Sequence, residues 1–385
     1  MSADLNMLER SSVLKGDLLD YANSPALARA LRTELRRQFG KVVVADEGEL
    51  IEFFDAFMLE HRLHDGRTVL ERYLDEHPKL AAGDRAILQG WRDPVQGLFE
   101  VVERAGDALV VVNLVDSLTY RVRANAGPQV LQPMEPESFV ASRIVPLGDE
   151  WLLSGAQRMY PKSARAEVLR AAAQIAFSMP RLAFRNPETL RRGWELQKRD
   201  RDWFIEFFGS DTVVLGWAEA AGRLAQYQRF QIDRAVAEAG PKADESHRPL
   251  EPTATGWLED LHEAATIGVV YDQADGMGVY ADFQVFLDAF TNPGPEATAA
   301  QIKVVRSYLN DEAISPAIFH RMAEEYPEGC DRVFRQLLGR PGFSWRTDGQ
   351  ALLRKHKKDQ VDAVPLPRMV PLSETLAAHF TAPER

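Results

Sequence analysis

The spacing of hydrophobic residues predicts helices over roughly the first ninety residues. Asp46 and Glu49 have the spacing of a capping box, the hydrogen-bonded start of a helix. Apolar residues then recur every three or four positions, at Leu50, Phe53, Phe54, Phe57 and Met58. A second periodic run follows Gly66 and stops at Pro78, and a third ends near Pro94. The pattern therefore indicates several short amphipathic helices.

From Gly97 the hydrophobic period changes from helical spacing to two. Leu118, Tyr120 and Val122 alternate with Thr119, Arg121 and Arg123, which is typical of a strand with one buried and one wet face. Turn residues separate five such runs between residues 97 and 155. Five short strands in so little chain predict a small, strongly bent sheet or barrel.

Helical spacing returns after Pro161. Asn186 followed by Pro187 is typical of a helix start, and this helix should reach Phe208 before Gly209 stops it. A further helix is expected over 217–239. Residues 240–256 hold three prolines and two glycines and read as a linker. Beyond them the pattern indicates a helix over 257–265, a strand over 267–271, several helices, an extended proline-containing arm and a last helix over 374–380.

These patterns predict an α+β fold that is mainly α, with helical regions flanking a small five-stranded, barrel-like antiparallel β module. The expected divisions are an N-terminal helical region, the β module, a helical segment, a linker and a mainly helical C-terminal domain. Their boundaries are placed at 1–92, 93–161, 162–239, 240–256 and 257–385.

Composition narrows the classes of partner. The 385 residues carry 46 Lys and Arg against 57 Asp and Glu, so the formal net charge of −11 disfavours nucleic acid. Cys330 is the only cysteine, which excludes an intramolecular disulfide and a multi-cysteine zinc site. No run of residues has the length and apolar character of a membrane helix or a signal peptide. A cytoplasmic protein with no membrane partner is the expectation.

Four strings resemble segments of uncharacterised bacterial proteins, some of whose relatives carry a cysteine-rich SEC-C zinc motif. They are DGRTVLERYLDEHP with WRDPVQGLFEVVE, then SRIVPLGDEWLLSG, then FFGSDTVV. The resemblance runs from about Glu52 to Asp348. The zinc motif is absent here, so no metal role carries over, and the resemblance implies one shared fold unit without an assigned activity.

Motifs of known chemistry are incomplete in this chain. There is no GxxxxGK, no GxSxG and no GxGxxG after a strand, so no phosphate loop or nucleophile elbow has a candidate. Ser12 and Lys15 have the Ser-x-x-Lys spacing of a serine–lysine nucleophile. The motifs that accompany it, Ser-Asp-Asn and Lys-Thr-Gly, are absent, so the pair is explained by chance. No catalytic residue and no cofactor is therefore predicted.

Three groups of residues have a composition that suits metal ions. Glu60, His61 and His64, followed by Asp65, lie where the first strong helix should end, and Glu60 and His64 would share one helix face. Glu259 and His262 form a single Glu-x-x-His, whereas di-iron sites need two. Asp272, Asp275 and Asp282 fail the spacing of a calcium loop. Solvated helix ends and ordinary turns explain all three, so no metal site is predicted.

Binding candidates come from basic, aromatic and strand residues. LLRKHKK at 352–358 and LRRGWELQKRDRDWF, with Trp194 and Trp203, interleave cations and aromatics. Over residues 93–160, nine acidic and five basic residues give the β module a net charge of −4, which argues against an oligonucleotide groove. The wet face with Thr119, Arg121 and Arg123 still offers a place for a ligand.

The absence of a complete catalytic set favours a non-catalytic binding or scaffold protein whose partner is another protein. Aromatic residues are enriched at interface cores, so Trp194 and Trp203 are the leading contact residues. The alternative is a hydrolase with a dispersed site, with or without a metal ion, built from residues such as His61, His64, His262 or Asp272. A nucleic-acid-associated protein stands third and would use the basic residues at 354–358.

Overall fold

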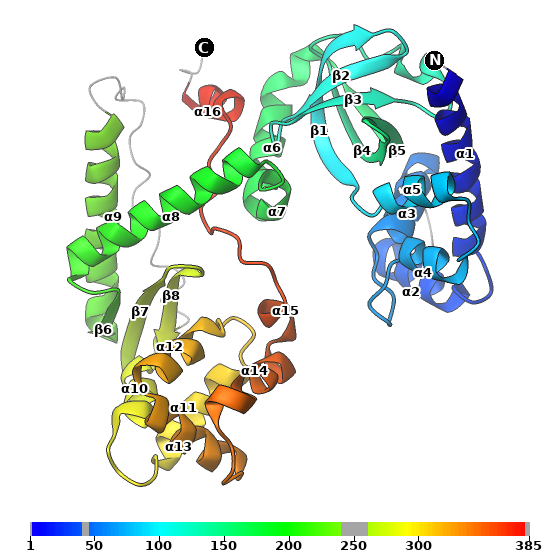
Figure 1. Ribbon diagram of the computed structural model, residues 1–385. Coiled ribbons are helices and arrows are strands. Elements are labelled where there is room, and N and C mark those ends of the chain that lie inside the picture. Colours follow the sequence, from blue (N-terminus) through cyan, green and yellow to red (C-terminus); the bar gives the residue numbers. More distant parts are fainter. Residues whose placement is uncertain (1, 41–45, 240–260, 382–385) are drawn as a thin grey trace. The chain divides into compact units, whose positions relative to one another are not determined.

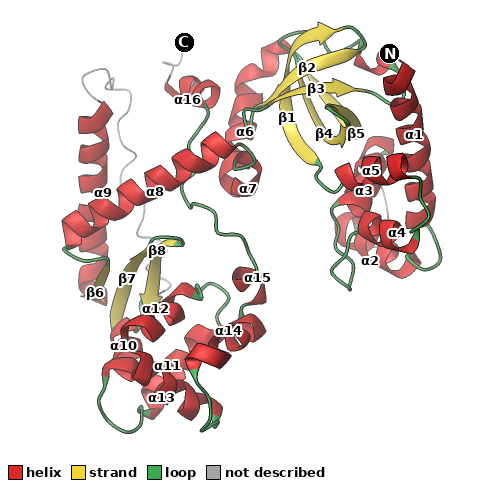
Figure 2. Ribbon diagram, viewed as in Figure 1, coloured by secondary structure: helices red, strands yellow, loops and turns green. Residues whose placement is uncertain are grey.

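The computed structural model describes residues 2–40, 46–239 and 261–381 (Figures 1 and 2). The chain divides into two compact units. Unit 1 contains residues 1–189 and the C-terminal segment from Leu372, and unit 2 contains residues 190–371. The chain therefore passes between the units twice, once within a long helix and once after Pro371.

Unit 1 begins with five helices packed around an aromatic core. They are α1 (Ser2–Ala22), α2 (Ala28–Phe39), α3 (Glu47–Leu59), α4 (Val69–Glu76) and α5 (Ala82–Gly90). Phe53, Phe57 and Trp91 are buried at the centre of this core. The predicted capping box is confirmed, because the Asp46 side chain accepts from the Glu49 N–H and the Glu49 side chain accepts from the Asp46 N–H.

The β module follows as a ring of five strands, as the alternation predicts. The strands are β1 (Val95–Ala105), β2 (Ala108–Asn113), β3 (Thr119–Arg123), β4 (Phe139–Leu147) and β5 (Glu150–Tyr160). They are hydrogen-bonded in the closed order β1-β2-β3-β5-β4, with β4 returning to β1. A short 3₁₀ helix, η1 (Pro128–Leu131), lies between β3 and β4. The inside of the ring is apolar, with Phe99, Tyr120 and Ile144 buried there.

The prediction of an antiparallel module is wrong at one junction. β3 pairs with β5 in parallel, through Val122 with Trp151 and Arg123 with Leu152, whereas the other four junctions are antiparallel. The reason is parity: strand direction cannot alternate all the way around a ring with an odd number of strands. Once five strands close, at least one neighbouring pair must run parallel.

Helices complete unit 1. A 3₁₀ turn, η2 (Lys162–Ala164), leads into α6 (Arg165–Ser178) and α7 (Pro180–Ala183). The last helix of the chain, α16 (Glu374–Thr381), packs on α6 and buries Leu376. The predicted helix start at Asn186 and Pro187 is confirmed, because the Asn186 side chain accepts from the Glu188 N–H.

Unit 2 combines a three-stranded antiparallel sheet with helices. The sheet has the order β6-β7-β8, and in chain order the elements are α8 (Pro187–Phe208), β6 (Thr212–Gly216), α9 (Trp217–Ala239), β7 (Thr266–Asp272), β8 (Gly276–Ala281), α10 (Phe283–Thr291), α11 (Ala299–Asn310), α12 (Ala317–Glu325), α13 (Pro327–Leu338), α14 (Trp345–His356) and α15 (Lys358–Val361). One core joins α8 and α9 to β7, and a second lies among α10–α14.

Most predicted elements of unit 2 are confirmed, with two omissions. The structure has α9 over the expected residues and a strand where 267–271 predicted one. Strands β6 and β8 were not predicted. The expected linker at 240–256 and the first residues of the expected 257–265 helix lie outside the described residues, and residues 261–265 form a turn that leads into β7.

Candidate functional site

A buried guanidinium lies where α3 meets the strand ring. The Arg143 side chain on β4 is only 1% exposed. It faces three carboxylates, two within α3 and one on the residue that follows α3. Its Nη1 lies 2.9 Å from both Glu52 Oε1 and Asp55 Oδ2, and its Nη2 lies 2.8 Å from Glu60 Oε2. A charge buried this deeply persists only when it is paired, and here the pairing is threefold.

Asp55 is the centre of the same cluster. It accepts from Arg143, from the Ser154 hydroxyl at 2.8 Å and from the Lys15 ammonium, while Lys15 Nζ also donates to Ser154 Oγ at 2.8 Å. Burial would raise the pKa of Asp55, but Lys15 and Arg143 outweigh it and hold that pKa below its usual value. We name Lys15, Glu52, Asp55, Glu60, Arg143 and Ser154 the buried ion cluster.

The buried ion cluster is built to join elements. Its members come from α1, α3 with its C-cap residue Glu60, β4 and β5. The contacts of Arg143 and Ser154 join the helices to the ring, and the Lys15–Asp55 pair joins α1 to α3. Gly155 permits the approach of α3: its φ is +71°, and a Cβ there would lie 2.5 Å from Glu52 Oε2. Ser154 and Lys15 have the hydroxyl and the amine of a serine–lysine catalytic pair. In such a pair the amine must be uncharged to act as the base, whereas the Lys15 amine forms an ion pair with Asp55.

The low pKa of Asp55 predicts a loss of stability in acid. A carboxylate whose pKa is depressed in the folded state contributes stability above its unfolded pKa, and that contribution is lost as the pH falls through the folded value. We expect the stability of unit 1 to decline below about pH 4, the ordinary pKa of aspartate. Denaturant unfolding of the Asp55→Asn variant across this range should show less stability at neutral pH and a flatter dependence. An unchanged slope would contradict the assignment.

Beside the buried ion cluster lies a cavity of about 540 Å³, within the size range of ligand sites. Helices α2, α3, α6 and α7 and strands β1, β4 and β5 all contribute to it, and Glu52 belongs both to it and to the cluster. We call it the α3 groove. Its lining residues are Gln38, Phe39, Asp46, Gly48, Glu49, Glu52, Gln96, Gly97, Leu98, Ala141, Ser142, Ala156, Gln157, Arg158, Tyr160, Ile175, Met179 and Leu182.

The α3 groove has an apolar side and an acidic side. Phe39, Leu98, Ile175, Met179 and Leu182 supply the apolar surface, and Met179 is 39% exposed. The lining has three acidic residues, Asp46 and Glu49 of the capping box and Glu52, which pairs with Arg143. Its one basic residue, Arg158, is exposed and has no ion pair within the described part of the chain. The groove therefore suits an occupant that is partly apolar and positively charged.

The strand face predicted to bind a ligand is already neutralised. Arg121 and Arg123 both pair with Glu150, and Arg123 also pairs with Asp107 at 2.7 Å. Thr119 is exposed beside them. A ligand on this face would have to displace these ion pairs. Binding at Thr119, Arg121 and Arg123 stays a prediction, and the ion pairs count against it.

The two predicted contact tryptophans do not form one patch. Trp194 and Trp203 are both half-buried on α8. They are nine residues apart, which on a helix of 3.6 residues per turn is a rotation of roughly 180° beyond full turns. They flank the buried stripe of Gly193, Gln197 and Phe204 from opposite sides, so one partner surface cannot cover both.

The metal-like group at the end of α3 is dispersed. Glu60 and His64 do not share a helix face, because α3 ends at Leu59 and His64 lies exposed in the following loop. Glu60 pairs with Arg143, and His61 stacks on Phe57. The prediction of a shared face is therefore wrong.

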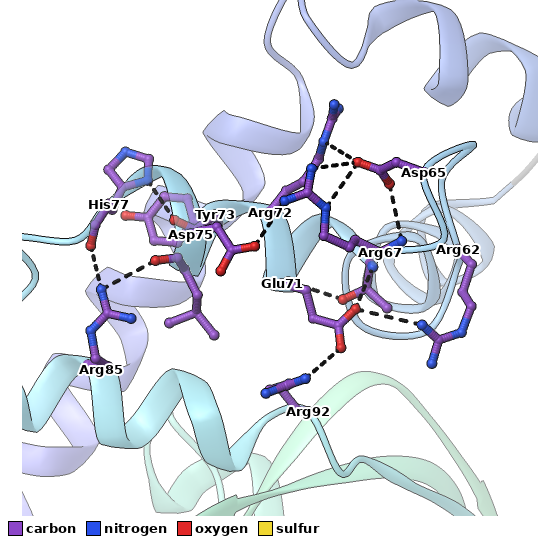
Figure 3. Close-up of polar contacts among 12 residues, drawn as sticks. Arg62, Asp65, Arg67, Glu71, Arg72, Tyr73, Asp75, His77, Arg85 and Arg92 are labelled. Atoms are coloured by element: carbon purple, nitrogen blue, oxygen red, sulfur yellow. Dashed lines mark hydrogen bonds and ion pairs between the residues drawn. The ribbon is translucent and has the colours of Figure 1, made fainter.

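The loop after α3 is held by a network of ion pairs around α4 (Figure 3). Asp65 pairs with Arg67 at 2.8 Å and with Arg72 at 3.0 Å, and Glu71 pairs with Arg92 at 2.8 Å. Each of these carboxylates is therefore already in an ion pair with an arginine. Among the described residues, no group of three or more His, Cys, Asp or Glu is placed to hold a metal ion.

The acidic residues near the β7–β8 turn have separate structural roles. Asp272 Oδ1 accepts from the N–H groups of Ala274 and Asp275, which forms the hairpin turn. Asp282 Oδ1 accepts from the Ala265 N–H. His262 is exposed, and Glu259 lies outside the described residues. The turn interpretation of Asp275 and Gly276 is confirmed.

The basic stretches are largely used inside unit 2. Lys357 is buried and donates to the carbonyls of Asp311 and Ile314, and Arg354 pairs with Asp362. On α8, each of four cations is paired with a carboxylate; these are Arg191, Lys198, Arg199 and Arg201. Paired cations release fewer counterions on binding a polyanion, so these stretches offer little to nucleic acid.

The buried ion cluster was not predicted, although the sequence holds a signal for it. Asp55 interrupts an apolar helical run, and Arg143 interrupts a strand of buried residues. Opposite charges inside two apolar runs indicate a buried pair, because neither is tolerated alone.

Comparison with known proteins reaches only unit 1. Residues 6–181 match a family of unknown function, DUF7986. The match includes the strand ring, the buried ion cluster and the α3 groove, and it says nothing of relatives with a SEC-C motif. No curated protein and no solved structure matches the chain. Separately, no helix in the described ranges is long and apolar enough to cross a membrane.

Proposed function

We propose that the chain is a non-catalytic binding protein and that the α3 groove holds a segment of another protein. The observation that carries this is a cavity of ligand-binding size whose neighbouring ionisable groups, Asp55 and Arg143, are tied to one another rather than turned to a reacting atom. The apolar side and the acidic side together favour a segment with apolar side chains next to lysine or arginine.

The two alternatives have less support. For a dispersed hydrolase site, His61 is stacked on Phe57, His64 is exposed in a loop, and Asp272 holds the β7–β8 turn through its Oδ1. For nucleic acid, the pairing of the basic residues on α8 and the burial of Lys357 leave few available charges. His61 does lie 3.7 Å from the Glu34 carboxylate, but Arg37 also pairs with that carboxylate, and neither His61 nor His64 lines the α3 groove.

The test selects peptides from a random library on the full-length chain. We expect enrichment of peptides with two or three apolar residues adjoining Lys or Arg, and weaker binding at high salt because the acidic side contributes. The Met179→Asp variant should weaken binding by about tenfold or more, since it places a charge where the peptide would cover an apolar side chain.

A matched control lies two residues earlier, in α6. Phe177 is 57% exposed and is not among the groove residues, so Phe177→Asp should bind the selected peptides like the parent chain. Thermal unfolding of both variants checks that each is folded. Failure to enrich any apolar and basic motif, or equal losses in the two variants, would reject the groove as the binding site.

A further inference from the structure

Unit 2 contains a second cavity, of about 430 Å³, beside strand β8. The β7–β8 hairpin forms one wall, and Asp200 of α8 and Ser315 before α12 form others. The extended segment 364–371, which we call the strap, completes it with Arg368 and Met369. All of these residues belong to unit 2.

The hydroxyl of a largely buried tyrosine, Tyr280, faces this cavity. The Tyr280 side chain is 7% exposed, and its ring packs on Phe283 and Tyr308. The hydroxyl lies over Gly278, where a Cβ would come within 2.6 Å of it. No hydrogen bond to this hydroxyl is present among the described residues, and the oxygen is not one of the buried partnerless atoms, so it is accessible within the cavity to a ligand. Burial, followed by Asp275 and Asp272, raises the pKa of Tyr280 to about 12, so the phenol stays a donor.

Charges of both signs line the cavity without pairing with each other. Arg368 is positioned by its own backbone N–H, which donates to Gln197 Oε1 at 2.7 Å, and by its Nε, which donates to the Asp275 carbonyl at 3.1 Å. Its guanidinium makes no ion pair within the described residues. The opposing carboxylate of Asp275 accepts from Ser315.

Asp200 adds a second carboxylate that is rigidly held. Its Oδ2 accepts from the Tyr271 hydroxyl at 2.7 Å, and its Oδ1 accepts from Gln231 and Tyr227. Supports of this kind fix the orientation of charged groups before any ligand arrives, which lowers the cost of binding. The cavity therefore presents an exposed guanidinium held through its Nε, two hydrogen-bonded carboxylates and the Tyr280 phenol.

We propose that this cavity binds a small zwitterion of the α-amino-acid class. The ligand carboxylate would lie against the Arg368 guanidinium and accept from the Tyr280 hydroxyl, and the ligand ammonium would lie against Asp275 and Asp200. Met277, Val279 and Met369 would contact its side chain. A simple anion such as phosphate would meet two carboxylates, and a simple amine would meet the guanidinium, so a ligand with both charges fits best.

The test measures binding of each proteinogenic L-amino acid to the full-length chain by isothermal titration calorimetry. We expect at least one to bind, and both its N-acetyl derivative and its amide to bind much more weakly, because each blocked form lacks one charge. Arg368→Gln and Asp275→Asn should each weaken binding by about ten- to a hundredfold, the range for a charge-assisted hydrogen bond.

Arg306→Gln is the matched control, because Arg306 is exposed on α11 and does not line the cavity. It should bind like the parent chain, as should the groove variant Met179→Asp, so that this proposal and the proposed function fail separately. Tyr280→Phe tests the phenol without changing the packing of the ring. The proposal is overturned if no amino acid binds, if the blocked forms bind as well as the free one, or if Arg306→Gln weakens binding as much as Arg368→Gln.

Discussion

Replacing Arg143 with alanine is expected to destabilise unit 1 by about 3–5 kcal/mol, the usual cost of removing one partner from a buried ion pair. The variant leaves Asp55 and Glu52 facing each other beneath the strand ring without the guanidinium that balances them. Chemical denaturation, followed by hydrogen exchange of peptides from α3 and β4, measures the loss and places it in unit 1.

Two further variants separate this effect from a general loss of charge. Arg158→Ala removes an exposed arginine of β5 with no ion pair in the described ranges, and it should change stability by less than about 0.5 kcal/mol. The double variant Arg143→Ala with Asp55→Asn should lose less than the sum of the two single changes, because the second change removes a charge that the first left unpaired. Additive losses would contradict direct coupling through the cluster.

Local chemistry was enough to predict most elements. The start of α3 follows from Asp46 and Glu49, and the end of α8 from Gly209, because capping groups and left-handed glycines act over a few residues. Strand β6 could not be found this way. It is five residues long between two helices, and its strand conformation depends on pairing with β7, which begins far along the chain at Thr266.

The prediction that all neighbouring strands run antiparallel was wrong for a different reason. The alternation of Tyr120 and Val122 with Arg121 and Arg123 predicts which face of the strand is buried. It does not predict whether the neighbouring strand runs parallel or antiparallel. Five strands that are all antiparallel to their neighbours cannot close into a ring, so closure and an odd strand number together require a parallel junction. The sequence pattern does not say which pair of strands forms it, and in the fold it is β3 with β5.

The candidate site could be predicted only in its composition. Asp55 and Arg143 each stand out as a charge in an apolar run, but they are 88 residues apart, and other charges in the chain could have been the partner. The α3 groove depends on seven helices and strands meeting, which no local pattern encodes. Conversely, Trp194 and Trp203 of α8 were predicted as contact residues because aromatic residues are common at interfaces. Their spacing of nine residues on a helix already implies that they lie on opposite sides of it.

The second large effect is expected at Gly329 in α13. An alanine Cβ there would lie 2.0 Å from the carbonyl oxygen of Phe290 and 2.9 Å from its carbonyl carbon, and these are backbone atoms that cannot rotate away. Helices α10 and α13 would have to separate, and Phe290 and Phe334 pack between them. We expect Gly329→Ala to cost about 3 kcal/mol, at the upper end of the range for overpacked cores.

The sign of this change makes it decisive, because glycine to alanine in a helix usually stabilises by up to about 1 kcal/mol. Gly222 of α9 provides the matched control in unit 2: it is exposed, and nothing lies within 4 Å of the Cβ that an alanine would add. Gly222→Ala should therefore raise the melting temperature slightly, whereas Gly329→Ala should lower it by roughly 6–12 °C in a unit of this size. If Gly329→Ala behaved like Gly222→Ala, the close packing of α13 on α10 would be wrong, and with it the arrangement of the second core of unit 2.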